Sequence, residues 1–471
     1  MKFFKVFLAA LLAVLVSGII SSLMWVIIFV GLAGSMEQTT KAVITPQTIV
    51  KIDFAENITE APTKNPLAGF DYATMTMAKS SHLLKVLQSV EKAKSDERVK
   101  GLYLNFTGMG GITTGALEEL RAAIVDFKQS GKFVVAYNEG YSQGTYYLAS
   151  VADKIYLHPE GGFSWAGMAQ TSIFFKGALD KLGLNAEAIR PTVCKYKSAV
   201  EPYIRKEMSK ENKAQMQTMV DDLWGVLVGA IAESRSLDAK KLMQLADKLE
   251  VTQPEDALKH GLVDALIYED EMDAKFAEYG VEKGLDGEYN IISLGDYMAL
   301  APATLNITAP AVGIVYAEGQ IFDGAGEDDN IYSANMVETI RKARKDKNIK
   351  SVVLRVNSPG GSALASDVIW REIELLKEKK PVVISMGSMA ASGGYYISAP
   401  GDVIVSDKLT LTGSIGVFGM IMNPNNMLTN KVGLSFDSVS TNDHSTLGSF
   451  GHNMDAVERA TIMKSVDKVY T

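Results

Sequence analysis

The N-terminus holds the longest stretch of the chain without a charged residue. Val6–Met36 is 31 residues long, and Lys2 and Lys5 precede it. A helix needs about 20 apolar residues to cross a bilayer, whereas the apolar part of a cleaved signal peptide has about 7–15. The stretch has no polar face, unlike a helix that covers a core. The pattern predicts one transmembrane helix within residues 1–36, with cleavage after Ala33–Ser35 as the alternative.

Apolar strands alternate with amphipathic helices in the rest of the chain. Ser351–Val356 is a short β-branched run, and Pro381–Ser385 is another apolar run. Between them, Asp367–Lys377 carries apolar residues at helical spacing. Strands that alternate with helices indicate βαβ units and an α/β fold. Residues 205–245 are rich in helix-forming residues and predict a longer helical region.

A decayed internal repeat relates two parts of the chain. Val99–Leu104 aligns with Ile349–Leu354 at an offset of 250 residues, and Tyr146–Tyr147 aligns with Tyr395–Tyr396 at an offset of 249. Two further matches keep these offsets, Asp153 with Asp402 and Lys181–Leu184 with Lys431–Leu434. A nearly constant offset over more than 100 residues indicates a duplication.

The apolar N-terminal stretch and the duplication together predict three domains. They are a membrane anchor at 1–36, a first α/β repeat at 37–300 and a second α/β repeat at 301–471. The second repeat is the shorter one, because Tyr470 aligns with Trp224 and the first repeat continues well past Trp224. We therefore expect a chain that ends inside a helix and is a fragment of a longer protein, which sequencing the gene past codon 471 would test.

Charge and cysteine content narrow the possible functions. The net charge is −8 and no basic block is present, so nucleic acid is not an expected partner. Cys194 is the only cysteine, so no intramolecular disulfide can form. Cys194 as a nucleophile is a weak alternative, because a lone cysteine is more often a small buried apolar residue. The lysines before the apolar stretch and Glu37 after it predict a cytoplasmic N-terminus and export of everything after residue 36.

A glycine-rich segment of the second repeat follows a predicted strand. Asn357–Ser362 contains the adjacent glycines Gly360 and Gly361. Such a pair lets the backbone turn sharply and direct N–H groups into a cleft, as an oxyanion hole requires. The alternative is an ordinary turn between a strand and a helix.

A second glycine-rich segment, Met389–Tyr396, follows the next predicted strand. It places Ser392 at a strand-to-helix turn, directly before two glycines. A serine there is exposed and lies near the N–H groups of a helix N-terminus, which favour developing negative charge. This position suits a nucleophile, and the alternative is that Ser392 only caps the helix.

A nucleophilic serine needs a base. The chain has five histidines, and none lies in a recognisable motif. His444 is the nearest downstream candidate, in a polar stretch typical of a solvated loop. A lysine can serve instead if burial lowers its pKa from about 10.4 toward 7–8. Composition alone does not choose among the 47 lysines and arginines.

Four segments together resemble one peptidase family. They are Val353–Ser362, Ser388–Ile397, Leu411–Gly419 and Tyr196–Ile204. In combination they look like the long, duplicated form of the signal peptide peptidase A family (protease IV, peptidase family S49). The resemblance covers nearly the whole chain and implies an α/β fold of two tandem repeats similar to the Clp protease/crotonase superfamily, preceded by one transmembrane helix.

The resemblance also implies the roles of particular residues. Ser392 matches the family's nucleophile, and Lys197 matches its general base. Ser414 matches the serine that orients the lysine amine. Gly361 and Gly393 are the expected backbone donors of the oxyanion hole. The implied enzyme is a serine-type endopeptidase with a serine/lysine dyad and an acyl-enzyme intermediate.

The repeat supports a single site built from both copies. At an offset of 249, Ser392 aligns with Gln143 and Ser414 aligns with Trp165, so the first copy lacks both serines. At an offset of 250, Lys197 has no lysine counterpart in the second copy. We therefore expect the second copy to supply the serines and the first copy to supply the lysine.

Two neighbouring residues compete with these assignments. Lys195 is the rival of Lys197, and residues two apart on a strand face opposite ways, so only one of them can be the base. Gly360 is the adjacent alternative to Gly361 as an oxyanion donor.

The family resemblance implies the biological setting as well. It implies an enzyme of the inner (cytoplasmic) membrane with a single span and its catalytic region on the periplasmic or extracytoplasmic side. Expected partners are signal peptides, other apolar peptide segments and the membrane, in a homo-tetramer. No metal or nucleotide cofactor is expected. The alternatives are a non-catalytic crotonase-like membrane scaffold or peptide-binding protein, and an acyl-CoA enzyme, which the exported location disfavours.

Overall fold

The computed structural model describes residues 7, 12–25, 43–54, 57–62, 70–71, 76–77, 80–107, 112–300, 309–327 and 330–471. The predicted anchor at 1–36 lies largely outside these residues, although 12–25 form a helix. Within the described ranges, no helix is both long enough and apolar enough to cross a membrane. The predicted domain boundary at residue 300 stays a prediction, since 301–308 are also outside the described residues.

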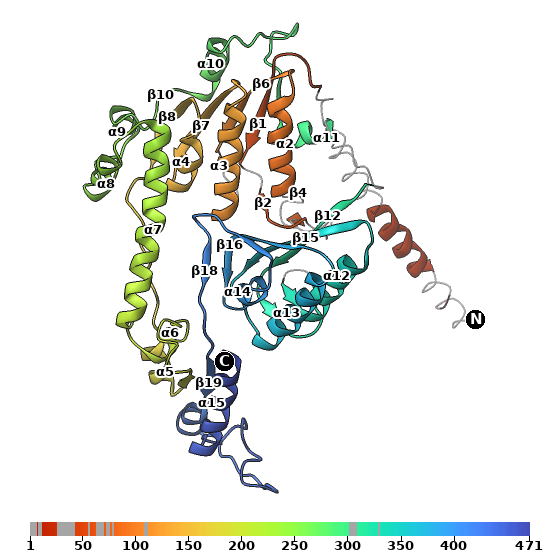
Figure 1. The fold of residues 1–471 in the computed structure, drawn as a ribbon, viewed down its shortest axis with the longest axis vertical. Helices are drawn as coiled ribbons and strands as arrows, with labels where there is room; N and C mark the ends of the chain where they lie inside the picture. The colour runs from red at the N-terminus through yellow and green to blue at the C-terminus, as the bar shows by residue number, and fades with distance from the viewer. Residues whose placement is uncertain are drawn as a thin grey trace.

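Two separate sheets of parallel strands confirm the α/β class (Figure 1). The first sheet has the strand order β10-β8-β7-β6-β1-β11, and the second has the order β12-β15-β16-β17, with β18 also paired to β16. The first sheet comprises β1 (Thr48–Asp53), β6 (Val99–Asn105), β7 (Phe133–Tyr141), β8 (Lys154–Phe163), β10 (Ala265–Leu266) and β11 (Ile291–Ser293). The second comprises β12 (Ala311–Glu318), β15 (Ile349–Ser358), β16 (Val382–Ala391), β17 (Val403–Val405) and β18 (Leu411–Gly413).

Helices follow the strands in the order that the hydrophobic pattern predicts. Those of the first half are α2 (Leu83–Ser95), α3 (Thr114–Lys128), α4 (Gln143–Ala149), α5 (Lys176–Leu182), α6 (Glu201–Ile204), α7 (Lys210–Arg235), α8 (Ala239–Asp247), α9 (Pro254–Lys259), η1 (Glu269–Glu271), α10 (Met272–Glu278) and α11 (Leu294–Leu300). Those of the second half are α12 (Ser333–Lys345), α13 (Ala363–Lys377), α14 (Gly393–Ser398), η2 (Met427–Val432) and α15 (Ala456–Tyr470). Four short pairings use β2 (Asn57–Thr59) with β5 (Ser80–His82), β3 (Phe70–Asp71) with β4 (Thr76–Met77), β13 (Ile321–Phe322) with β14 (Ile331–Tyr332), and β9 (Asn185–Ile189) with β19 (Gly419–Asn423).

The same backbone-locking contact recurs in both sheets. In the first, the Val134 N–H donates to Asp153 Oδ2 over 2.7 Å. In the second, the Val382 N–H donates to Asp402 Oδ2 over 2.8 Å. Each aspartate stands just before the strand that follows in the sheet, so it fixes the start of one strand against its neighbour. The aligned aspartates therefore have the same structural role in the two halves.

The two sheets differ in what covers one of their faces. In the first sheet, Tyr103 and Tyr156 are only 4% and 3% exposed, because they pack under residues of α10 and of the loops on either side of it. The covering residues are Ile267, Met272, Phe276 and Val281. In the second sheet, Val312 and Val405 are 59% and 52% exposed. An apolar face of the second sheet is therefore open in the described structure.

Two kinds of contact bring the halves together. The antiparallel pairing of β9 with β19 joins a strand of the first half to one of the second. Elsewhere the Gly115 N–H, at the start of α3, donates to Ser388 Oγ over 2.8 Å. A Cβ on Gly115 would lie 2.8 Å from the carbonyl carbon of Gly387, so only glycine permits this approach. The pairing of β9 with β19 sets the loop after β9 beside the loop after β18.

Candidate active site

Ser392 lies where β16 ends and α14 begins. It has φ 54° and ψ −117°, a conformation that non-glycine residues rarely adopt. Its N–H donates to the carbonyl of Gly413 over 2.9 Å, which ties the turn to β18. Such strain persists only where the surrounding structure enforces it, and it is typical of functional turns. The turn holds Ser392 directly before the first residue of α14.

Two backbone amides lie beside this turn. The loop that contains Gly361 packs against Gly393, and a Cβ on Gly393 would lie 2.6 Å from Ser366 Oγ and 3.2 Å from the Gly361 nitrogen. Glycine at 393 is therefore required for the two loops to meet. No hydrogen bond within the described ranges uses the N–H of Gly361 or of Gly393. Two donors are thus available for an oxyanion next to Ser392.

Lys197 is buried in the loop after β9, with only 6% of its surface exposed. Its Nζ donates to the hydroxyl of Ser414 over 3.0 Å and also to the carbonyl of Ser414. Burial lowers the pKa of Lys197, and the nearby thiol of Cys194 opposes this only in part. Among the described residues, no carboxylate forms an ion pair with Lys197. These surroundings favour a neutral amine.

All five predicted site residues line one cleft of about 520 Å³. Ser392 and Gly393 come from the β16–α14 turn, Gly361 comes from the loop after β15, and Ser414 and Lys197 come from the two loops that the β9–β19 pairing holds together. Part of the wall is apolar and includes Ala199, Ile415, Val417, Phe418 and Val469. The arrangement brings a strained serine, a buried lysine and free amides together in a partly apolar setting.

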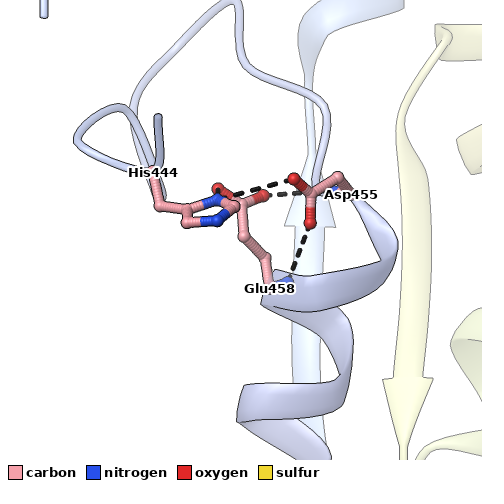
Figure 2. Close-up of side chains that lie close together, drawn as sticks. All are labelled: His444, Asp455 and Glu458. Carbon is pink, nitrogen blue, oxygen red and sulfur yellow. Dashed lines mark hydrogen bonds and ion pairs between the residues drawn. The ribbon is translucent and has the colours of Figure 1, made fainter. Parts of the chain in front are cut away.

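Three of the four competing candidates, Lys195, Cys194 and His444, do not line the cleft. Lys195 is exposed and does not line the cleft. Cys194 is buried and does not line the cleft, because its Sγ packs against Gly416, where an added Cβ would lie 3.2 Å away. His444 contacts Glu458 at the N-terminus of α15 and does not line the cleft (Figure 2). Gly360 does line the cleft, but its N–H donates to Ser358 Oγ.

The aligned positions of the first half are filled by other side chains. Gln143 Oε1 accepts hydrogen bonds of 2.8 Å from the N–H groups of Ala166 and Gly167. Trp165 is 1% exposed, and its Nε1 donates to the carbonyl of Leu242. These contacts stabilise the turn of the first half with residues that have no nucleophilic oxygen.

Several cleft residues carried no signal in the sequence. Gln320 and Ser366 line the cleft from the loop after β12 and from α13. Tyr396 also lines it, and its hydroxyl donates to Asp367 over 2.9 Å. The end of α15 contributes Tyr470. Gln320, Ser366 and Tyr470 belong to none of the motifs and reach the cleft only through the fold. Tyr396 ends the second glycine-rich segment, but the sequence assigned it no role.

The second half of the chain, which carries the serine at the turn between β16 and α14, is similar to the Clp protease family. The sequence model of the Clp protease family matches residues 308–406. The sequence model of peptidase family S49 matches residues 126–282 and 374–471, more than half of the chain. The chain therefore belongs to peptidase family S49.

Three curated relatives extend this result. Protease 4 of Haemophilus influenzae is 40% identical over 78% of this chain and 60% of its own length. Protease 4 of Salmonella typhi is 35% identical over 88% of this chain and 67% of its own length. The chloroplastic serine protease SPPA of Arabidopsis thaliana is 32% identical over 71% of this chain and 50% of its own length. The chain thus spans between half and about two thirds of the length of these relatives.

Proposed function

We propose that this chain is a serine endopeptidase in which Ser392 is the nucleophile and Lys197 is the general base. The observation that carries the proposal is the Lys197 amine, which is buried beside Ser414 in the cleft that also contains Ser392. A lysine accepts a proton at neutral pH only when its ammonium form is disfavoured. The burial of Lys197, without a carboxylate partner among the described residues, supplies that condition.

The proposed reaction moves one proton in each step. Ser392 Oγ attacks the peptide carbonyl while its proton passes to Lys197 Nζ, and the carbonyl oxygen becomes an oxyanion. The N–H groups of Gly361 and Gly393 donate to that oxygen. The C–N bond then breaks as the lysine ammonium gives its proton to the leaving amine. A water repeats the sequence on the acyl-enzyme and releases the acid and free Ser392.

Apolar peptide segments are the proposed substrates, with cleaved signal peptides as the natural class. The apolar part of the cleft wall supports this choice, because apolar side chains are bound by apolar walls. We also propose two tandem Clp-like repeats, an N-terminal membrane anchor from the Val6–Met36 stretch, an extracytoplasmic catalytic region and a homo-tetramer. Protease accessibility in sealed vesicles, followed by sizing in detergent, tests the anchor and the assembly.

Covalent labelling tests the function directly. A serine-directed peptidyl phosphonate is expected to label detergent-solubilised protein once per chain, and peptide mapping should place the label on Ser392. Ser392→Ala should take up no label, whereas Ser366→Ala, which removes another cleft hydroxyl, should label as the wild type does. A wild-type protein that neither labels nor cleaves peptides, although folded, would instead be the peptide-binding scaffold.

Ser414→Ala tests whether the hydroxyl positions the lysine. Losing one hydrogen bond of about 1–1.5 kcal/mol should lower kcat about tenfold and leave KM nearly unchanged. The hydroxyl stabilises the ammonium form, so the midpoint of the pH–activity profile should fall as well. A change in KM alone, with the profile fixed, would contradict a positioning role.

A further inference from the structure

A cluster of one histidine and two carboxylates, His444, Asp455 and Glu458, lies at the start of α15 (Figure 2). Each carboxylate uses one oxygen to cap the helix. Asp455 Oδ1 accepts from the N–H groups of Val457 and Glu458, both over 2.8 Å, and Glu458 Oε2 accepts from the Asp455 N–H over 3.0 Å. The other two oxygens converge on His444 Nδ1, at 3.5 Å for Asp455 and 3.2 Å for Glu458. The helix cap thus uses one oxygen of each carboxylate and leaves the second pair facing His444.

The charges around the two carboxylates are the second feature of this cluster. The Glu458 side chain is only 2% exposed. In the described part of the chain no lysine or arginine forms an ion pair with Asp455 or Glu458, and their ionic neighbours are His444 and His452. Buried carboxylates are normally paired with a cation or bound to a metal. Glu458 is therefore a buried carboxylate whose ionic neighbours in the described part of the chain are imidazoles, and the half-exposed Asp455 lies beside it.

We propose that His444 Nδ1, Asp455 Oδ2 and Glu458 Oε1 bind a divalent transition-metal ion of the Zn²⁺ type. Bonds of about 2.0–2.2 Å in a tetrahedral site put ligand atoms about 3.3–3.6 Å apart. The two separations at His444, 3.2 and 3.5 Å, fit that spacing, and all three ligand atoms lie within 4.8 Å of one another. An imidazole with two carboxylates suits Zn²⁺ or Co²⁺ better than Mg²⁺ or Ca²⁺, which prefer oxygen ligands alone.

His452 supports the site from outside. Its Nε2 lies 2.6 Å from Glu458 Oε2, the oxygen that faces away from His444. A contact of this kind orients a metal-binding carboxylate. The positive end of the α15 dipole opposes cation binding, so both carboxylate charges are needed to hold the ion.

The expected role of the ion is structural. It would join the loop that carries His444 to the first turn of α15, and the last turn of the same helix contributes Val469 and Tyr470 to the cleft. The ion itself lies apart from Ser392 and takes no part in the proposed peptide hydrolysis. Metal binding and hydrolysis can therefore fail independently of each other.

Metal titration of chelator-treated, dialysed protein tests the proposal. One Zn²⁺ per chain is expected by calorimetry, Co²⁺ should give the visible absorption of a tetrahedral complex, and Zn²⁺ should raise the Tm where Mg²⁺ does not. His444→Ala, an exposed position, should weaken Zn²⁺ binding at least 100-fold, and Asp455→Asn should do the same while its amide oxygen keeps the cap. His260→Ala, which lies outside the cluster, should bind as the wild type does. No Zn²⁺ binding by wild type, or equal binding by both variants, would overturn the site, as would a Tm that responds to acidification but not to Zn²⁺.

Discussion

Replacing Lys197 with methionine is expected to lower kcat at least about 10³-fold and to leave the fold intact. A general base contributes about 10²–10⁴-fold, and losing the base also leaves Ser392 without a proton acceptor. Methionine fills a similar volume, so the effect reports on the amine rather than on packing. Because serine and base act as one unit, Lys197→Met combined with Ser392→Ala should be little worse than either change alone. Hydrolysis of an apolar fluorogenic peptide in detergent measures this.

The pH dependence of activity and of stability tests the role of Lys197 a second time. The pKa of Lys197 is lowered by burial, so kcat/KM should rise with pH as one group deprotonates, with a midpoint below the ordinary lysine value of 10.5. Lys197 then binds its proton more tightly in the unfolded chain than in the folded chain. The protonated lysine therefore lowers the free energy of unfolding at low pH, and this loss disappears as the pH rises from the pKa of Lys197 in the folded chain to 10.5. Lys197→Met removes that loss and should raise the Tm at neutral pH.

Lys195→Met is the matched control, since Lys195 is exposed two residues away. It should change neither the activity, nor the pH profile, nor the Tm. A Lys197→Met protein that keeps more than about a tenth of the wild-type kcat would remove Lys197 from the mechanism. An activity profile that is flat across pH 5–9 would do the same for any lysine base.

Much of the site could be predicted because it consists of short local motifs. The sequence shows the glycines around Gly361 and Gly393 and the serine between a strand and a helix. Such a turn can be predicted because it depends on residues that are adjacent in sequence. The choice of Lys197 over Lys195 came from family resemblance. In the structure Lys197 is buried and Lys195 is exposed. The residues around them in the sequence do not show this difference.

The rest of the site depends on contacts between distant segments. The φ of 54° at Ser392 could not be predicted, because serine has no intrinsic preference for that region and only the surrounding strands enforce it. The antiparallel pairing of β9 with β19, which sets Lys197 beside Ser414, joins segments more than 200 residues apart. The open face of the second sheet was also not predicted, since its strands have the same apolar pattern as the covered strands of the first sheet.

Replacing Arg355 with methionine is expected to lower the free energy of unfolding by about 3–5 kcal/mol, because it leaves buried carboxylates without their cation. Arg355 Nη2 lies 2.8 Å from Glu60 Oε2 and 2.6 Å from Glu119 Oε1, and Nη1 donates to Ser385 Oγ. The Glu60 side chain is 1% exposed and belongs to the first half, 295 residues from Arg355. The guanidinium is therefore the central polar contact between the two halves, and urea unfolding of the solubilised protein measures its effect.

The neighbouring groups explain why the loss should be large. Burial already raises the pKa of Glu119 despite the attraction of Arg355, so a second uncompensated carboxylate beside it would be strongly disfavoured. Adding Glu60→Gln and Glu119→Gln to Arg355→Met should recover part of the lost stability, since the two carboxylates that pair with Arg355 would then carry no charge. Lys342→Ala, which removes an ion pair exposed at both ends, should cost no more than about 0.5 kcal/mol. If Arg355→Met costs as little as that control, or if the glutamine changes recover nothing, the halves are held by apolar contact and by the β9–β19 pairing rather than by this ion cluster.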